Sequence, residues 1–315
     1  MLRITSKRHP VTFYLTVFIG ALLFLVLGII LLPSDINPYN TALQSPKGTL
    51  IIVSSLLFLN AFYLIFRYYK NAPNIIVDTY TISFNKQIFK LEELVGIELT
   101  GKQPFPYIIN HSMEGAAFYF KNKQVKYMYN DIYSNSSEIK SFIKQIVIDK
   151  KGIFQITDST VKAAEMDKDN FTLFKGKQLT SVSGIALWSL ILFVAYIIIT
   201  EKFNLERTLS LLTLGLIWFA HSSWWMYYFK VSENYFVVKD HNFIWKESIY
   251  RITNIKEITF ETASRKPNCL RITTKDFRIK LYPASTLSNK KWLELKDNLE
   301  TKGVKVINKC ITDSR

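Results

Sequence analysis

The sequence predicts a membrane protein of mixed class, with two transmembrane helical hairpins that are each followed by a small antiparallel β domain closed by a C-terminal helix. Three observations support this prediction. Four long apolar runs occur in two pairs, a stretch of alternating apolar and polar residues follows each pair, and a helical stretch ends each half. The 315 residues are 49% hydrophobic and 15% aromatic, which fits a chain that is partly embedded in lipid.

The four apolar runs are long enough to cross a bilayer as helices. A helix rises about 1.5 Å per residue, so about 20 apolar residues span the hydrocarbon core. Backbone polar groups in lipid must be satisfied within the segment, which favours helices. The predicted spans cover residues of about 11–32, 49–68, 179–200 and 208–229. The first run is too long for a signal peptide and lacks a small-residue cleavage pattern, so we expect it to be retained.

Positive charges mark one side of these spans. Arg3, Lys7 and Arg8 precede the first span, and Arg67 and Lys70 close the second. The second pair of spans shows the same bias, whereas the loops within each pair carry little net charge. By the positive-inside rule, we expect a multi-pass protein of the cytoplasmic (inner) membrane with both termini in the cytosol.

The spans divide the chain into five parts. These are a basic N-terminal flank with hairpin 1 at 1–69, a cytosolic β domain at 70–157, a linker at 158–178, hairpin 2 at 179–229 and a second cytosolic β domain at 230–315. The two halves repeat one order of elements, which indicates an internal duplication.

Short segments also support the duplication. Residues Phe66–Lys70 match Met226–Lys230 at the ends of the second and fourth predicted spans, and Phe118–Tyr127 match Ile272–Leu281 further along. A helical stretch follows in each half, at roughly 136–148 and 288–301.

The alternation predicts which side chains of the second β domain point inward. Leu270 and Ile272 are expected to face the core while Arg271 faces out. After a turn at residues 275–276, Ile279 and Leu281 are expected to face inward again.

The order of elements in each β domain resembles that of a known family. Residues Tyr80–Phe84 through Leu94–Ile97, and Tyr235–Val238 through Ile255–Ile258, follow a pattern of strand, turn, strand, I-x-x-I segment, hairpin and helix. With two spans in front, this pattern resembles bacterial membrane proteins that carry pleckstrin-homology-like (PH-like) domains. The resemblance implies a PH-like fold and a binding or scaffolding module, and it supplies no catalytic residues.

The sequence lacks a pattern typical of enzymes. The four histidines are scattered, and neither Cys269 nor Cys310 has a ligand partner at metal-site spacing. No glycine-rich phosphate loop occurs. We therefore expect a protein that is not an enzyme and that needs no cofactor or metal.

The formal charge is +15, and one cluster of the basic residues is a candidate binding site. Arg271, Arg278 and Lys280 are expected to share the outward face of one hairpin, with Arg265 and Lys266 in the loop beside it. Near an inner leaflet, each such residue is attracted to anionic lipid by about 1 kcal/mol. Exposed basic residues without any ligand are the alternative interpretation. Nucleic acid is not expected, because the aromatic residues of these strands alternate inward and form no stacking surface.

Two polar residues lie within the predicted spans. Asn60 and His221 stand at similar distances from the inner ends of the second and fourth spans. Ionisable groups in lipid are functional candidates, but polar groups there also hydrogen-bond across helix bundles. We expect both residues to serve helix packing.

The leading hypothesis is a non-enzymatic integral membrane protein whose cytosolic PH-like domains bind a protein partner or anionic lipid headgroups in a scaffolding or regulatory role. An immunity or resistance protein that neutralises a membrane-directed toxin or peptide is an alternative. A transporter of small solutes, based on Asn60 and His221, is a third hypothesis. The sequence leaves open the oligomeric state and whether the two hairpins pack within one chain.

Overall fold

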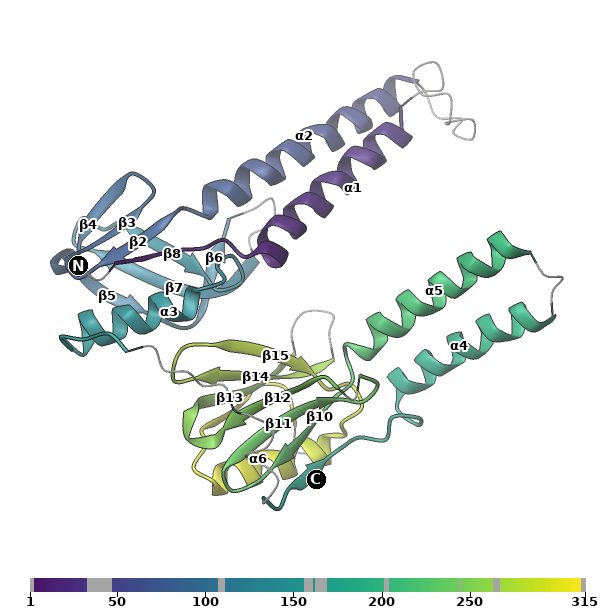
Figure 1. Ribbon diagram of the computed structural model, residues 1–315. Helices are drawn as coiled ribbons and strands as arrows, with labels where there is room; N and C mark the ends of the chain where they lie inside the picture. The colour runs from purple at the N-terminus through teal and green to yellow at the C-terminus, as the bar shows by residue number, and fades with distance from the viewer. Residues whose placement is uncertain are drawn as a thin grey trace. The chain divides into compact units, whose positions relative to one another are not determined.

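The structure is a computed structural model that describes residues 3–32, 47–106, 111–155, 161, 169–200, 204–243, 245–262 and 267–312. The chain forms two compact units, Met1–Ile156 (unit 1) and Thr157–Arg315 (unit 2). In each unit a pair of long helices extends from two β-sheets (Figure 1). This arrangement confirms the predicted mixture of helices and antiparallel sheets.

The helix pair of unit 1 packs closely. It consists of α1 (Thr16–Ile30), which follows the short π-helix η1 (Pro10–Leu15), and α2 (Lys47–Asn71). The Ser54 hydroxyl donates a hydrogen bond of 2.6 Å to the Gly28 carbonyl across the two helices. A Cβ atom on Gly28 would lie 2.7 Å from the ring of Phe58, so the missing side chain allows this approach.

Among the residues that the structure describes, three helices are long and apolar enough to cross a membrane: Pro10–Ile30, Gly48–Asn71 and Val182–Thr200. The last of these is helix α4 of unit 2. Many of their large apolar side chains face away from the unit; Phe62, Leu192 and Ile199 are examples. Apolar surface of this extent requires lipid or another protein to cover it. The three helices therefore indicate a membrane-associated protein.

The predicted fourth span at 208–229 is wrong at its C-terminal end. Helix α5 runs from Leu205 to Ser223, and strand β10 (Tyr227–Val231) follows it. Alternate residues of β10 are buried in unit 2, so its aromatic side chains serve a sheet core instead of a membrane boundary. Helix α5 also includes Glu206 and Arg207, and it is not one of the three helices above.

Unit 1 contains two antiparallel sheets. The first has the order β1-β2-β3-β4; the second has the order β5-β7-β6, with β8 paired to β7. Their strands are β1 (Arg3–Thr5), β2 (Ile75–Asp78), β3 (Thr81–Phe84), β4 (Gln87–Lys90), β5 (Leu94–Glu98), β6 (Lys102–Phe105), β7 (His111–Phe120) and β8 (Val125–Tyr129). The predicted C-terminal helix is confirmed as α3 (Ser136–Phe142), which continues as the π-helix η3 (Ile143–Ile148).

Unit 2 also contains two sheets, with the orders β12-β11-β10-β9 and β15-β14-β13-β16. Only β16 runs parallel to its partner, β13, among the described pairings of this unit. The remaining strands are β9 (Thr172–Phe174), β11 (Tyr235–Asp240), β12 (Glu247–Arg251), β13 (Ile255–Thr262), β14 (Asn268–Thr274), β15 (Ile279–Pro283) and β16 (Val306–Asn308). The predicted helix at 288–301 is confirmed as α6 (Asn289–Thr301).

In each unit, both sheets and the C-terminal helix contribute to one hydrophobic core. Trp292 of α6 is fully buried in unit 2. Its ring lies 5.7 Å from the ring of Phe229 in the first sheet and 4.7 Å from that of Phe260 in the second. The helix therefore fills the space between the two sheets.

Each helix pair is inserted into a sheet. Strand β1 precedes helices α1 and α2, and it pairs with β2, which follows them; Ile4 lies opposite Val77. Strand β9 precedes α4 and α5 and pairs with β10, with Leu173 opposite Lys230. The predicted boundaries at 69 and 178 therefore cut through sheets. Three-residue strands are too short to give a periodic signal, so the sequence could not reveal them.

The basic N-terminal flank has a structural role at the end of α2. The Arg8 guanidinium donates a 2.7 Å hydrogen bond from Nη2 to the Ala72 carbonyl. Its Cζ lies 5.3 Å from the ring centre of Phe13 and 5.0 Å from that of Tyr69. A cation at a helix C-terminus interacts favourably with the helix dipole. Arg8 thus joins the N-terminal segment to the point where α2 enters the sheet.

The hairpin between β7 and β8 has a three-residue loop. The Phe120 amide donates to the Gln124 carbonyl at 3.0 Å, and the Lys123 amide donates to the Phe120 carbonyl at 2.9 Å. Lys123 adopts a left-handed conformation, with φ of 62°. A type I turn followed by a left-handed residue is a common loop of this length.

The hairpin between β14 and β15 has the same geometry. The Thr274 amide donates to the Arg278 carbonyl and the Phe277 amide to the Thr274 carbonyl, both at 3.0 Å. Phe277 takes the left-handed position, with φ of 64°. The two units thus use the same hairpin loop at the same place in their second sheets.

Candidate functional site

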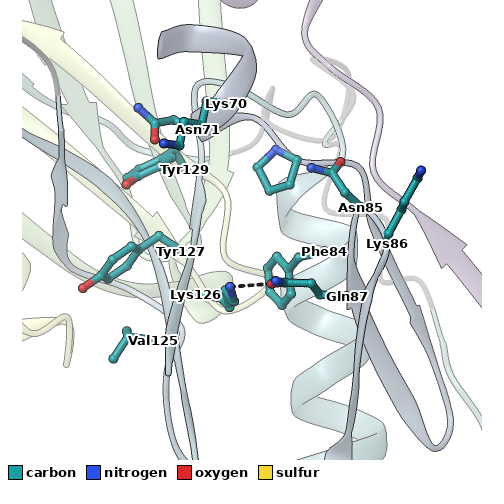
Figure 2. A pocket seen from close by; sticks show the side chains of 11 residues that line it. Lys70, Asn71, Phe84, Asn85, Lys86, Gln87, Val125, Lys126, Tyr127 and Tyr129 are labelled. Atoms are coloured by element: carbon teal, nitrogen blue, oxygen red, sulfur yellow. Dashed lines mark hydrogen bonds between the residues drawn. The ribbon is translucent and has the colours of Figure 1, made fainter. Parts of the chain in front are cut away.

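Unit 1 contains a pocket of about 550 Å³ where α2 enters the β domain (Figure 2). It lies between the β3–β4 turn and strand β8, next to the last residues of α2. It is lined by Lys70, Asn71, Pro73, Phe84, Asn85, Lys86, Gln87, Val125, Lys126, Tyr127 and Tyr129.

The lining of this pocket is cationic. Lys70 ends α2, Lys86 lies in the β3–β4 turn and Lys126 lies on β8. None of the described lining residues is acidic. Lysine ammonium groups only donate hydrogen bonds, and amide side chains can donate as well. The pocket therefore favours an anion with several acceptor oxygens.

Lys126 occupies the gap between the two sheets. It lies opposite Phe118 in β7, on the face that turns toward the core. Its Nζ donates a 2.7 Å hydrogen bond to Oε1 of Gln87 on β4, and Figure 2 shows the two side chains pointing toward each other. The Nζ also lies 5.6 Å from the ring centre of Phe89. Lys126 is thus held by both sheets.

The β3–β4 turn holds Lys86 at the rim. Asn85 precedes it in a left-handed conformation, with φ of 55°. The Asn85 amide donates to the Asn74 carbonyl at 2.8 Å, and its side-chain Oδ1 accepts from the Asn74 amide at 2.7 Å. Asparagine tolerates left-handed backbone and suits such turns. The turn is therefore fixed while Lys86 itself stays exposed.

Two further side chains fix the inner wall. Tyr129 donates a hydrogen bond to the Pro104 carbonyl at 2.7 Å, and Asn71 donates one to the Pro106 carbonyl at 3.1 Å. Burial raises the pKa of the Tyr129 phenol above its ordinary value, so this group stays neutral.

Two of the residues predicted as a binding site come together in unit 2. Arg278 and Lys280 line a smaller cavity of about 270 Å³ with Glu247 and Tyr250. Lys280 lies opposite Ile272, as Lys126 lies opposite Phe118 in unit 1.

The cavity of unit 2 is less cationic than the pocket of unit 1. The Arg278 guanidinium pairs with Asp276 at 2.9 Å. Glu247, which lines the cavity, pairs with Lys239 at 2.9 Å. One carboxylate thus pairs with Arg278 and another lines the same cavity as Lys280, which weakens the attraction of an external anion.

The prediction that Arg271 shares a face with Arg278 and Lys280 is wrong. Arg271 lies opposite Leu281, whereas Lys280 lies opposite Ile272, on the other face of the sheet, where its side chain is exposed. The Arg271 side chain is only 11% exposed, and its Nη2 lies 3.4 Å from Oε2 of Glu261. Arg271 is therefore a mostly buried residue of the sheet and does not belong to an exposed basic surface. Arg265 and Lys266 lie outside the described residues.

This error arises from the loop before β15. The left-handed Phe277 adds one residue to the turn, so the alternation after it is displaced by one position. Tyr282 is buried opposite Leu270 in consequence. Ile279 and Leu281, which were expected to face inward with Leu270, lie on the other face.

The two intramembrane candidates do not occupy matching positions. Asn60 is half-buried in α2, eleven residues before the end of that helix at Asn71. His221 is exposed, only two residues before the end of α5 at Ser223, and its ring lies 4.8 Å from that of Trp225. The expected similarity fails because α5 ends six residues before the predicted limit at Phe229.

The pocket of unit 1 was missed from the sequence. Its residues come from the three separate segments 70–73, 84–87 and 125–129, which only the fold brings together. The sequence contained one indication of this pocket. The alignment of Phe118–Tyr127 with Ile272–Leu281 matches Lys126, which lines the pocket, with Lys280, which was predicted as a site residue.

Unit 2 has a buried pair of titratable residues, Asp240 and His241, where β11 ends. Asp240 accepts hydrogen bonds from the amides of Asn242 at 2.9 Å and Phe243 at 3.1 Å, yet its burial raises the pKa of the carboxyl. The neighbouring His241 ring lies 3.2 Å from the Thr286 hydroxyl. Burial, aided by the charge of Lys175, lowers the pKa of His241 to about 4.

We expect acid to destabilise unit 2 through His241. Between pH of about 6.5, the ordinary histidine value, and about 4, the unfolded chain binds a proton that the folded chain does not, so stability falls as pH falls. Asp240 acts in the opposite direction, because its raised pKa favours the folded state as the carboxyl protonates. Protection factors of the amides in β10 to β12, which correct exchange for its intrinsic pH dependence, measure the sum of the two contributions at pH 7.5 and 4.5.

A His241→Gln variant isolates the histidine contribution to this pH dependence. It should lose the acid-induced fall in protection factor that the parent protein shows between the two pH values. An equal fall in both proteins would contradict the role assigned to His241.

No protein-family model matches the chain, and no curated protein is significantly similar to it. Within the described ranges, no group of three or more His, Cys, Asp or Glu side chains is arranged to hold a metal ion. The interpretation of the site therefore depends on its own geometry and charge.

Proposed function

We propose that this chain is a non-enzymatic integral membrane protein that binds an anionic lipid headgroup in the pocket of unit 1, at the cytosolic surface of the cytoplasmic membrane. One observation carries the proposal: three lysines and no described carboxylate line a pocket at the end of a helix that can span a membrane. Binding there would serve a regulatory or scaffolding role.

The way each helix pair joins its sheet supports a hairpin topology. Because β1 pairs with β2 and β9 with β10, both ends of each helix pair are tied to one sheet. A pair that starts and ends at one sheet enters and leaves a membrane on the same side. By this reasoning α5 brings the chain back across the membrane after α4. Together with the positive-inside rule, this favours four spans with the sheets in the cytosol.

The proposal includes two related PH-like domains. The matching three-residue loops support a common origin of the two units. In addition, a β-bulge interrupts the pairing between Leu94 and Gly96 in unit 1, and another does so between Ile255 and Glu257 in unit 2. A single 3₁₀ turn precedes each bulge, at 91–93 and 252–254. Bulges are typically retained within families.

The dimensions of the pocket suit a headgroup. Ligand pockets usually enclose about 300–1,000 Å³, and the pocket of about 550 Å³ lies within this range. Lys70 and Asn71 end a candidate span, so the pocket adjoins the level at which headgroups lie. Each lysine near an anionic leaflet contributes about 1 kcal/mol, which makes three of them a substantial attraction.

Neutralising the pocket is expected to weaken lipid binding by at least about tenfold, because three lysines contribute about 3 kcal/mol near an anionic surface. The test uses full-length protein with Lys70→Gln, Lys86→Gln and Lys126→Gln together. Retention of phosphatidylglycerol relative to phosphatidylcholine is measured by native mass spectrometry and by binding to mixed nanodiscs.

A second triple variant serves as the control. Lys90→Gln, Lys121→Gln and Lys151→Gln remove the same charge from exposed sites of unit 1 that do not line the pocket. This variant should keep most of the preference for phosphatidylglycerol. Equal losses in both variants would show a general charge effect and would contradict a defined pocket.

A further inference from the structure

The loop between β11 and β12 of unit 2 is much longer than its counterpart in unit 1. Equivalent backbone hydrogen bonds flank the two loops, from Leu91 to Tyr80 and from Ile252 to Asn234, both at 2.8 Å. Eleven sequence positions separate the first pair (91 − 80) and eighteen the second (252 − 234), so the β11–β12 hairpin has seven additional residues. The turn is only Asn85–Lys86 in unit 1 and covers 241–246 in unit 2, so four of the seven lie in the loop and three lengthen the strands.

Two residues of this loop, Asn242 and Phe243, pack against the end of α5. The Phe243 ring lies edge-on to that of Phe219, with 5.9 Å between their centres. Asn242 donates a 2.8 Å hydrogen bond from Nδ2 to the Ser223 hydroxyl. The loop is therefore attached to the last turns of a helix instead of projecting freely from the sheet.

Charge and aromatic surface meet at this place. Lys246 Nζ lies 4.9 Å from the ring centre of Trp224 and 5.0 Å from that of Tyr227. Trp224 is 62% exposed and Trp245 is 78% exposed. We call Trp224, Phe243, Trp245 and Lys246 the anchor surface. Tryptophan with an adjacent lysine is typical of the boundary between hydrocarbon and headgroups. An amphipathic ring suits this layer, because its surroundings there are apolar on one side and polar on the other.

The position of Phe219 links the anchor surface to the membrane level. Phe219 and Trp188 both line an apolar groove between α5 and α4, and α4 is a candidate span. The Phe243 ring contacts Phe219 at this end of the helix pair. The anchor surface is thus continuous with the apolar surface of the helices.

We propose that the anchor surface inserts Trp245 and Trp224 into the interfacial layer of the bilayer, with Lys246 directed to anionic headgroups. The occupant is the lipid interface itself. Unit 2 would be held against the membrane by this loop, while the corresponding region of unit 1 has a short turn and the open pocket. The proposal does not depend on what the pocket binds.

The test places an environment-sensitive fluorophore at position 245. Full-length protein with Cys269→Ala and Cys310→Ser receives Trp245→Cys, is labelled with a nitrobenzoxadiazole (NBD) dye and is reconstituted in phosphatidylcholine–phosphatidylglycerol vesicles. The matched control is Thr253→Cys, an exposed residue at the opposite end of β12. We expect blue-shifted emission that spin-labelled lipid quenches at 245, and water-like emission without quenching at 253.

Two outcomes would overturn the proposal. Water-like emission at 245 would show that the loop stays in solution. Blue-shifted emission without quenching by spin-labelled lipid would show that a protein surface, such as a second copy of this chain, covers Trp245. If the labelled variant does not fold, quenching of the intrinsic fluorescence by brominated lipid is compared between the parent and Trp245→Tyr. A lower quenched fraction in the variant supports insertion, and an unchanged fraction rejects it.

Discussion

Replacing Trp292 with alanine is expected to destabilise unit 2 by about 3–5 kcal/mol, the usual cost of removing a large buried aromatic side chain. Trp292 has 0% exposure and contacts rings from both sheets. Its Nε1 has no hydrogen-bond partner among the described residues, so the loss comes from packing alone. Because small domains are stable by about 5–15 kcal/mol, this change removes a large part of the total.

Thermal unfolding and limited proteolysis of the full-length protein in detergent measure this effect. Cleavage should increase in unit 2 and stay unchanged in unit 1, since each unit has its own core. Lys290→Ala is the control, because it truncates an exposed side chain of the same helix. A similar loss of stability in both variants would contradict the assigned role of α6.

Replacing Gly176 with alanine is expected to separate β9 from its sheet. Gly176 lies between β9 and α4, and a Cβ atom there would stand 1.9 Å from the Thr286 carbonyl oxygen and 2.3 Å from its carbon. Backbone atoms cannot move aside as a flexible side chain can. Overpacking of this kind costs about 1–3 kcal/mol, and the three residue pairs between β9 and β10 would be strained as well.

Amide exchange of β9 and β10 measures the consequence of this change. Gly152→Ala is the matched control, because a Cβ atom at Gly152 would meet nothing within 4 Å. Exchange should rise in the first variant and remain at the parental level in the second. Unchanged exchange in Gly176→Ala would show that the connection between β9 and α4 can shift without cost.

Features that depend on neighbouring residues in the sequence were predicted well. The long apolar runs gave α1, α2 and α4, because the length of a helix that crosses a bilayer is set by its rise per residue. The helical stretches at 136–148 and 288–301 were also found. Alternation identified the buried side of β14, where Leu270 and Ile272 face the core.

Features that depend on distant pairing were not predicted. Strands β1 and β9 are three residues long, and only their pairing across a helix pair makes them strands. The aromatic run 227–229 fits a membrane boundary as well as a sheet core, so its composition could not locate the end of α5. The left-handed Phe277 reversed the expected faces of β15. This conformation could not be predicted, because phenylalanine rarely adopts it.

The candidate site was only partly accessible from the sequence. Charge pointed to Arg278 and Lys280, which do share a cavity, but it could not show the carboxylates that accompany them. The more cationic pocket of unit 1 was hidden, since its three lysines are up to 56 positions apart (126 − 70) and belong to three elements. A local excess of charge along the chain is thus a poor guide to a local excess of charge in space.

The insertion of each helix pair into a sheet has a consequence for how the protein is made. Thr5 pairs with Ile76, 71 positions later (76 − 5), so β1 leaves the ribosome long before its partner exists. The sheet can close only after both helices have been synthesised and the end of α2 has come back next to β1. If that return fails, β2 keeps an open edge that can aggregate or recruit other strands. Under the proposed membrane topology, completion of the sheet therefore also marks correct insertion of the helix pair.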